Sequence, residues 1–177
     1  MSTNWHVITG APSSGKTVLI THLCFLGYRV LPEAARILLN DELSKGKTAA
    51  EIRHDEYAFQ QKVLDLKIAA EARMPCASLT FFDRGLPDTL AYCRLYGFPE
   101  ARMVEALQSA EKRYRNVFLL APLQFVQDEA RTEDSALSSQ LSSILEQVYL
   151  DLNYNVVRVP ILSVAERAEF VLRALGL

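Results

Sequence analysis

The chain contains 177 residues, of which 50% are apolar and 23% are charged, and its formal net charge is -2. The length predicts a single domain, residues 1–177, and the near-neutral charge argues against a general nucleic-acid-binding protein, in which positive charge usually clusters. No apolar run approaches the ~18 residues that a membrane-spanning helix needs, and the start of the chain lacks the pattern of a signal peptide. Cys24, Cys76 and Cys93 match no metal-binding spacing, so we interpret them as reduced core thiols and expect a cytoplasmic protein.

Short apolar runs alternate with helical patterns along the chain. The runs predict strands at residues 5–9, 28–32, 78–82, 116–122 and 155–160. The helical patterns lie at residues 16–25, 33–43, 48–73, 87–97, 100–114, 136–152 and 163–175, and T-x-x-E and S-x-x-E capping boxes mark two of their starts. This alternation predicts an α/β fold, with a five-stranded parallel sheet covered by helices on both faces. Ligands of such sheets bind beyond the carboxyl ends of the strands, so the informative residues should follow each strand.

The stretch ITGAPSSGKT follows the first predicted strand and has the G-x-x-x-x-G-K-T spacing of a phosphate-binding loop. Gly10 and Gly15 admit backbone conformations that let successive N–H groups point at a phosphate. Lys16 can reach the β- and γ-phosphates, and Thr17 can offer a hydroxyl to Mg²⁺. The alternative, a glycine-rich turn with a chance lysine, is disfavoured by its place between a strand and a helix. The predicted nucleotide-binding residues are Gly10, Ala11, Pro12, Ser13, Ser14, Gly15, Lys16, Thr17 and Val18.

The sequence SLTFFDRG ends the third predicted strand with two charged residues. Asp83 stands where a carboxylate that holds Mg²⁺ or accepts a proton is expected, although an aspartate at this position could also cap the next helix. Arg84 could clamp an anionic substrate group through bidentate hydrogen bonds, and a surface ion pair is the alternative.

The glycine loop, the FFDRG corner and the ending VRVPILSVAERAEFVLRAL resemble the AAA_28-type P-loop ATPase/kinase family. That family is related to the ribosylnicotinamide kinase domain of bacterial NAD-metabolism regulators, and more distantly to thymidylate and deoxynucleoside kinases. The resemblance spans nearly the whole chain. It implies a P-loop NTPase fold of the nucleotide-kinase type, a three-layer sandwich with a lid segment at about residues 122–136.

The resemblance also implies residues on the acceptor side of the site. Glu33 and Arg36, in LPEAARILL, would face the substrate hydroxyl, although Glu33 could instead favour a helix start and Arg36 could be a solvated residue. Gln60, in YAFQQKVLDLK, carries the donors and acceptor that read a base edge, but its apolar neighbours have the spacing of a buried helix face, which we favour.

The lid segment of the family would contribute arginines to the transferring group. Arg131 matches that role, and its planar fork suits phosphoryl oxygens. The segment QDEARTEDS departs from well-studied kinases because it holds one arginine among four acids, which are Asp128, Glu129, Glu133 and Asp134. These acids could form a solvated loop, bind metal or repel anionic competitors.

These features favour phosphoryl transfer from ATP·Mg²⁺ to a small hydroxyl- or phosphate-bearing metabolite. Lys16 would polarise the γ-phosphate, and Thr17 and Asp83 would place Mg²⁺. Asp83 or Glu33 would take the acceptor proton, and Arg131 would stabilise the transition state. Adenine is the default base because the N-K-x-D guanine motif is absent from the sequence, although GTP stays an alternative nucleotide. The sequence does not specify an oligomeric state.

A different class of function also fits the sequence. The chain could be a nucleotide-dependent regulatory ATPase or binding protein that recognises a partner or a phosphoinositide with little turnover. The single lid arginine favours this alternative, and the paired carboxylates Glu33 and Asp83 oppose it.

Overall fold

The computed structural model describes residues 3–108, 113–122 and 132–177. Its strands are β1 (Trp5–Gly10), β2 (Arg29–Leu31), β3 (Thr80–Asp83), β4 (Asn116–Leu120) and β5 (Val156–Val159). They form one parallel sheet in the order β2-β3-β1-β4-β5, which confirms the predicted five-stranded parallel sheet. The central strand is β1, whose Ile8 is in register with Asp83 of β3 and Phe118 of β4.

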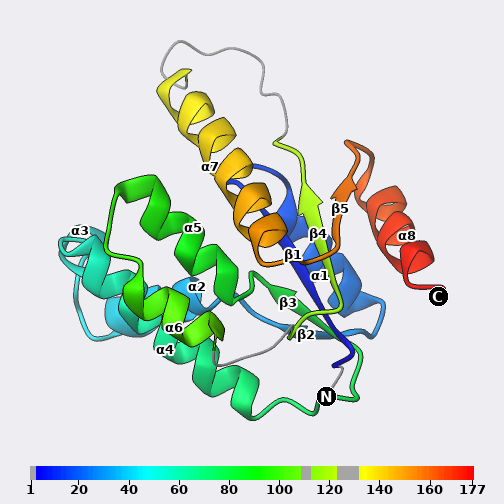
Figure 1. Ribbon diagram of the computed structural model, residues 1–177, viewed down its shortest axis with the longest axis horizontal. Helices are drawn as coiled ribbons and strands as arrows, with labels where there is room; N and C mark the ends of the chain where they lie inside the picture. The colour runs from blue at the N-terminus through cyan, green and yellow to red at the C-terminus, as the bar shows by residue number, and fades with distance from the viewer. Residues whose placement is uncertain (1–2, 109–112, 123–131) are drawn as a thin grey trace.

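Helices connect the strands and cover the sheet (Figure 1). In chain order they are α1 (Lys16–Phe25), α2 (Ala34–Ser44), α3 (Ala49–Ile52), α4 (Glu56–Ala72), α5 (Leu86–Tyr96), α6 (Ala101–Gln108), α7 (Thr132–Asp151) and α8 (Val164–Ala174).

Alternate residues of the strands face two different helical layers, because successive side chains of a strand point to opposite faces of a sheet. On one face, Ile8 and Phe118 pack in a buried cluster with side chains of α1 and α8. On the other face, Val7 and Val117 pack with Tyr149 of α7. The sheet therefore lies between two layers of helices, and the predicted three-layer α/β sandwich is confirmed (Figure 1).

The predicted continuous helix over residues 48–73 is wrong. Thr48 does form its capping box with Glu51, but this box begins the short helix α3, which ends at Ile52. A second N-cap follows at Asp55, whose carboxylate accepts a hydrogen bond from the Ala58 N–H at 2.9 Å. Asp55 caps an amide at the start of a new helix. The helical segment is therefore interrupted before Asp55, and α4 begins at Glu56.

Two other helix boundaries differ from the prediction. The helix predicted to reach Tyr114 ends at Gln108 within the described residues, and Tyr114 lies buried in an extended segment before β4. α7 begins at Thr132, earlier than the predicted start at Ala136. The predicted lid therefore overlaps the first turn of α7, while residues 123–131, including Arg131, lie outside the described residues.

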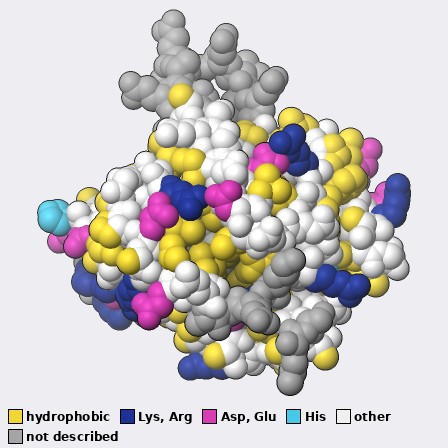
Figure 2. All heavy atoms as spheres, in the orientation of Figure 1, with side chains coloured by type: hydrophobic (Ala, Val, Ile, Leu, Met, Phe, Trp, Pro, Cys, Tyr) yellow, Lys and Arg dark blue, Asp and Glu magenta, His cyan; other side chains and the backbone are white. Residues whose placement is uncertain are grey.

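Surface exposure corrects the prediction for the cysteines. All three are free thiols, but only Cys93 is buried, whereas Cys24 and Cys76 are exposed. On the face drawn in Figure 2, acidic and basic side chains lie close together, so this view of the described residues shows no extended basic surface. Among the described residues, no helix combines the length and the apolar content needed to cross a bilayer.

Candidate functional site

The predicted phosphate loop lies between the end of β1 and the start of α1, at the carboxyl end of the sheet. Ser13 and Gly15 adopt left-handed backbone conformations with φ of 64° and 78°. A Cβ atom on Gly10 would lie 2.8 Å from Ser14 Oγ and 2.9 Å from the Leu120 carbonyl oxygen, so only glycine fits there. Alternation of left- and right-handed residues turns successive N–H groups to one side of a loop, which makes an anion-binding concavity.

The first turn of α1 adds further donors to this loop. Gly15 occupies the N-cap of α1 and provides no side-chain cap for the helix. The amides of the first turn have no carbonyl partners within the helix, and the helix dipole places partial positive charge there. The start of α1 therefore offers a phosphate-sized anion N–H groups without helical partners and a favourable field, while the Ser14 N–H of the loop donates to the Ala11 carbonyl oxygen at 3.3 Å.

Arg167 of α8 supports the phosphate loop from behind, and sequence reasoning missed it. The residue is 6% exposed, and its Nη1 donates to the Ser14 carbonyl oxygen at 3.1 Å. A Cβ atom on Gly15 would lie 2.7 Å from Nη1, so the two residues are closely apposed. An arginine on the face of α8 that also carries the buried Ala168 and Val171 was the signal available in the sequence.

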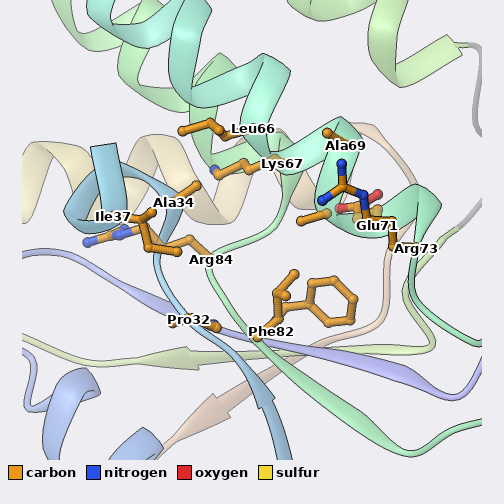
Figure 3. A pocket seen from close by; sticks show the side chains of 12 residues that line it. Pro32, Ala34, Ile37, Leu66, Lys67, Ala69, Glu71, Arg73, Phe82 and Arg84 are labelled. Atoms are coloured by element: carbon orange, nitrogen blue, oxygen red, sulfur yellow. The ribbon is translucent and has the colours of Figure 1, made fainter. Parts of the chain in front are cut away.

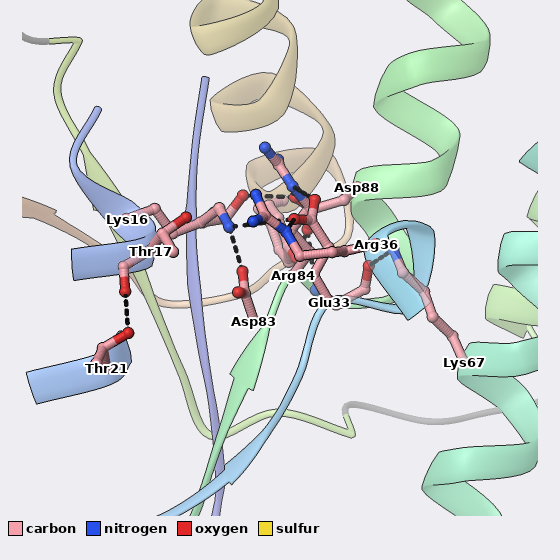
Figure 4. Close-up of polar contacts among 12 residues, drawn as sticks. Lys16, Thr17, Thr21, Glu33, Arg36, Lys67, Asp83, Arg84 and Asp88 are labelled. Carbon is pink, nitrogen blue, oxygen red and sulfur yellow. Dashed lines mark hydrogen bonds and ion pairs between the residues drawn. The ribbon is translucent and has the colours of Figure 1, made fainter. Parts of the chain in front are cut away.

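Lys16 is buried, at 5% exposure, and lies among acidic side chains (Figure 4). Its Nζ donates to Asp83 Oδ1 and lies 3.8 Å from Glu33 Oε2. Asp83 does not cap the next helix, since Gly85 occupies the N-cap of α5. Lys16 at the start of α1, Glu33 before α2 and Asp83 at the end of β3 thus meet in space, as the sequence predicted for one site.

The two carboxylates differ in their affinity for protons. Burial raises the pKa of Asp83 above its ordinary value, and the nearby Lys16 ammonium offsets this effect only in part. Burial also raises the pKa of Glu33, but Arg84 and Lys16 together outweigh it and bring the pKa below its ordinary value. Glu33 is therefore the more firmly ionised member of the pair, and Asp83 accepts a proton more readily.

Arg84 is a buried residue, so the alternative of a surface ion pair is wrong. It adopts a left-handed backbone conformation with φ of 71°, which is uncommon for a residue with a side chain. Its Nε donates to Glu33 Oε1 at 2.7 Å and its Nη1 to Asp88 Oδ1 at 3.1 Å. Burial alone would lower the pKa of Arg84, but Tyr92, Asp88 and Glu33 have a larger, opposite effect. The net pKa is raised above its ordinary value, so the guanidinium stays charged.

Two more buried charged groups surround the corner at Gly85, and neither was predicted. Lys67 of α4 donates to the Gly85 carbonyl oxygen at 2.7 Å and to Thr89 Oγ1 at 3.1 Å. Burial lowers the pKa of Lys67 to about 8. The Asp88 carboxylate accepts from the Gly85 N–H at 3.0 Å. The corner that carries Asp83 and Arg84 is thus fixed by side chains of two helices.

Other predicted site residues lie at the margin of this cluster or away from it. Thr17 and Val18 are exposed at the start of α1. Arg36 has an exposed side chain whose Nε lies 3.9 Å from Glu33 Oε2. Gln60 is buried, as the core-packing alternative predicts, and its Nε2 donates to Glu56 Oε1 of the same helix at 2.9 Å. Arg131 lies outside the described residues.

The donor set at the end of β3 and the start of α1 fits Mg²⁺. This ion prefers oxygen ligands and usually takes one or two from the protein, with water and phosphate oxygens completing the octahedron. Asp83 offers a carboxylate and Thr17 an exposed hydroxyl. The described residues contain no group of three or more His, Cys, Asp or Glu side chains that could hold a metal alone.

A pocket of about 230 Å³ lies beside the cluster, between α2, α4 and the ends of β2 and β3 (Figure 3). The pocket shares Arg84 and Lys67 with the cluster, but its lining does not include Lys16, Glu33 or Asp83. Its other lining residues are mainly apolar and include Leu31, Pro32, Ala34, Ile37, Leu66, Ala69, Ala70 and Phe82.

Solved structures with the same fold include a NadR protein, a thymidylate kinase, a deoxyadenosine kinase and a shikimate kinase. A NadR protein in complex with NR is 18% identical, with a TM-score of 0.71. The match covers 99% of this chain and 50% of that one, so this chain spans about half the length of the NadR protein. Thymidylate kinase from Ehrlichia chaffeensis is 12% identical, with a TM-score of 0.68 and full coverage of both chains. Deoxyadenosine kinase from M. mycoides, solved with products, is 14% identical, with a TM-score of 0.63 and coverage of 97% and 98%.

These likenesses establish the fold of the P-loop nucleotide kinases for this chain. No curated protein matches the chain in sequence. The sequence model of one family, AAA_28, which is described as an AAA domain, matches residues 5–167 and thus nearly the whole chain. The phosphate loop, the FFDRG corner and Arg167 all lie within that match, and the chain belongs to the AAA_28 family.

Proposed function

We propose that this chain is a phosphotransferase that moves the γ-phosphoryl group of ATP, or alternatively of GTP, to a small metabolite that carries a hydroxyl or a phosphate. The acceptor would be a nucleoside, a nucleotide or a ribosylated vitamin. The observation that carries the proposal is the meeting of Lys16, Asp83 and Glu33 at the carboxyl end of the sheet, next to the phosphate loop. Hydrolysis needs only a positioned water, whereas transfer needs groups on an acceptor side as well.

On the donor side, backbone N–H groups between Gly10 and Val18, apart from Pro12, which has none, would bind the β- and γ-phosphates. Lys16 would exchange its contact with Asp83 for a phosphate oxygen, since an ammonium group pairs well with either anion. Thr17 and Asp83 would hold Mg²⁺, which supplies positive charge to the phosphate oxygens when it is bound. Arg131 would add charge stabilisation to the transferring group.

On the acceptor side, a carboxylate would accept the proton of the attacking hydroxyl. Asp83 or Glu33 would perform this task; burial raises the pKa of Asp83 in the metal-free protein, and the positive charge of a bound Mg²⁺ would oppose that effect. Arg84 would orient the acceptor together with Glu33, to which it is already hydrogen-bonded. Arg36, whose side chain is exposed next to Glu33, would contact a more distant part of the acceptor.

A nucleotide-dependent binding protein with little turnover is the second candidate function. One observation favours it: the guanidinium of Arg84 is already bonded to two carboxylates, Glu33 and Asp88, and so has limited capacity for a phosphoryl group. In this function the acceptor side would recognise a partner or a phosphoinositide head group.

The test incubates the protein with γ-labelled ATP and Mg²⁺, and in parallel with labelled GTP, in the presence of a panel of nucleosides, nucleotides and ribosylated vitamins. Transfer of label to one acceptor supports the phosphotransferase. Label released only as inorganic phosphate, or nucleotide bound without any product, overturns it, and binding to phosphoinositide vesicles then separates the second candidate from a simple hydrolase.

Two variants assign the roles. Lys16→Met is expected to weaken nucleotide binding at least tenfold, and Asp83→Asn to abolish transfer while nucleotide still binds. Lys62→Met, which removes an exposed lysine of α4, is the matched control for Lys16. Equilibrium binding of a fluorescent nucleotide and the rate of label transfer give the two readouts. Unchanged nucleotide affinity in Lys16→Met contradicts the phosphate-loop assignment.

A further inference from the structure

Asp88 is a buried carboxylate, 1% exposed, that lies beside the proposed site without being part of the sequence motifs. Four groups donate hydrogen bonds to it. Thr9 Oγ1 and Arg84 Nη1 donate to Oδ1 at 2.5 and 3.1 Å, and the Gly85 N–H and the Tyr149 hydroxyl donate to Oδ2 at 3.0 and 2.5 Å. A helix cap explains the bond from Gly85 alone, because Asp88 is the third residue of α5.

The other three donors come from separate parts of the fold. Thr9 belongs to β1, Arg84 follows β3, and Tyr149 belongs to α7. Their bonds fill the remaining acceptor positions of both carboxylate oxygens, which leaves the group little freedom to rotate. Asp88 therefore has a defined orientation with respect to the sheet.

Asp88 is ionised in this surrounding. Burial raises the pKa of Asp88, but the charges of Lys67 and Arg84 and the hydrogen bonds from Thr9 and Tyr149 outweigh burial and lower the pKa below its ordinary value. A buried carboxylate keeps its charge only when such partners are present. Arg84 is therefore bonded to a full negative charge.

The guanidinium of Arg84 is fixed at two ends, by Asp88 at Nη1 and by Glu33 at Nε. The guanidinium group is planar and rigid, so two such bonds determine its direction. The second oxygen of Glu33 lies 3.8 Å from Lys16 Nζ. A continuous line of contacts thus runs from Asp88 through Arg84 and Glu33 to the phosphate loop (Figure 4).

We propose that Asp88 is a positioning residue, which fixes the guanidinium of Arg84 and thereby holds the Glu33 carboxylate on the acceptor side of Lys16. The part of this inference that concerns the placement of an acceptor rests on the proposed function. The strained backbone of Arg84 agrees with it, because left-handed residues with side chains persist where the surroundings fix them, and they are frequent at functional sites.

The first test measures the hold on Arg84 and needs no catalytic activity. In the ¹⁵N-labelled full chain, the NMR signal of the Arg84 Nε–H group is assigned because it disappears in Arg84→Lys. The rate at which this proton exchanges with solvent is then measured. The wild-type signal is expected to exchange slowly, and Asp88→Asn to speed the exchange at least tenfold. Asp151→Asn, which changes an exposed aspartate of α7 paired with Arg94, is the matched control and should leave the Arg84 signal unchanged.

The second test measures the acceptor. For the acceptor found with labelled ATP, Asp88→Asn should lower kcat/KM at least tenfold, while the Kd of the nucleotide changes less than twofold. A merely structural role for Asp88 would weaken both. An Arg84 signal that exchanges as slowly in Asp88→Asn as in the wild type overturns the inference, and so does an unchanged kcat/KM.

If Asp88→Asn does not fold, Tyr149→Phe removes one bond to Oδ2 and should speed the Arg84 exchange severalfold, and no change there overturns the inference. If no acceptor is labelled by the wild type, the proposed function fails, while the exchange experiment still decides whether Asp88 positions Arg84.

Discussion

Gly15 is the residue at which the phosphate loop and α8 come into contact. Its φ of 78° favours glycine, and Arg167 Nη1 lies 2.7 Å from the place of a Cβ atom. A side chain here would therefore meet two independent obstacles. Gly27 has a similar φ of 90°, but apart from its chain neighbours no atom lies within 4 Å of the corresponding Cβ position, so a side chain there would meet only the backbone obstacle.

Comparison of Gly15→Ala with Gly27→Ala separates the two effects. The backbone term is about 1–2 kcal/mol of unfolding free energy in both variants. Gly15→Ala should lose more than Gly27→Ala because Arg167 must move, and it alone should weaken nucleotide binding. Chemical denaturation and nucleotide titration measure these changes. Equal losses of stability in the two variants would contradict the apposition of Gly15 and Arg167.

At the residue scale, the sequence predicts those site residues that belong to short motifs. The phosphate-loop spacing and the end of an apolar strand are local patterns, and the structure brings the two residues they single out, Lys16 and Asp83, into contact. Asp88 and Lys67 were missed because their partners are distant: Tyr149 is 61 positions from Asp88, and Thr89 is 22 positions from Lys67. A buried charge of this kind has no local signature, since only tertiary packing brings its partners together.

At the scale of elements, the break between α3 and α4 shows how a cap overrides a helical pattern. Asp55 was interpreted as an interior residue of one long helix, but its carboxylate accepts from the Ala58 N–H and begins α4. The capping boxes at Thr48 and Ser163 were predicted correctly because each combines two residues at a fixed spacing. A single aspartate inside an amphipathic pattern carries a weaker signal.

Asp55→Ala should lower the unfolding free energy by about 1 kcal/mol, the usual contribution of an N-cap. Asp65→Ala is the matched control, because Asp65 lies on the exposed face of the same helix and forms a surface ion pair with Arg102. Such pairs contribute less, about 0–1 kcal/mol. Urea denaturation midpoints provide the comparison. A larger loss in Asp65→Ala than in Asp55→Ala would contradict the assignment of Asp55 as the cap.

At the scale of the whole molecule, Lys67 joins α4 to the corner after β3 and gives folding a dependence on pH. Burial lowers the pKa of Lys67 from 10.5 to about 8, with Asp88, Glu33 and Glu71 opposing the effect and Arg84 adding to it. Between about pH 8 and pH 10.5 the unfolded chain therefore binds more protons than the folded chain at this site. Stability rises with pH wherever the unfolded state binds more protons.

The wild type should accordingly gain up to about 3 kcal/mol of unfolding free energy relative to Lys67→Met as the pH rises through this window. Taking the difference between the two proteins removes the contributions of other titrating groups. Lys62→Met supplies the matched control on the same helix. Urea denaturation at several pH values measures the effect, and a difference that stays constant with pH would contradict the burial of Lys67 as a charged group.

The sheet ends in strands that are short on both sides. β2 has three residues and begins with the exposed Arg29, and β5 has four, among them Arg158, which is paired with Glu146. Unpaired backbone groups at the rim of a sheet attract strands from other molecules, and short strands with charged side chains discourage such pairing. The chain can therefore keep a fully parallel, largely apolar sheet while limiting strand-to-strand aggregation at high concentration.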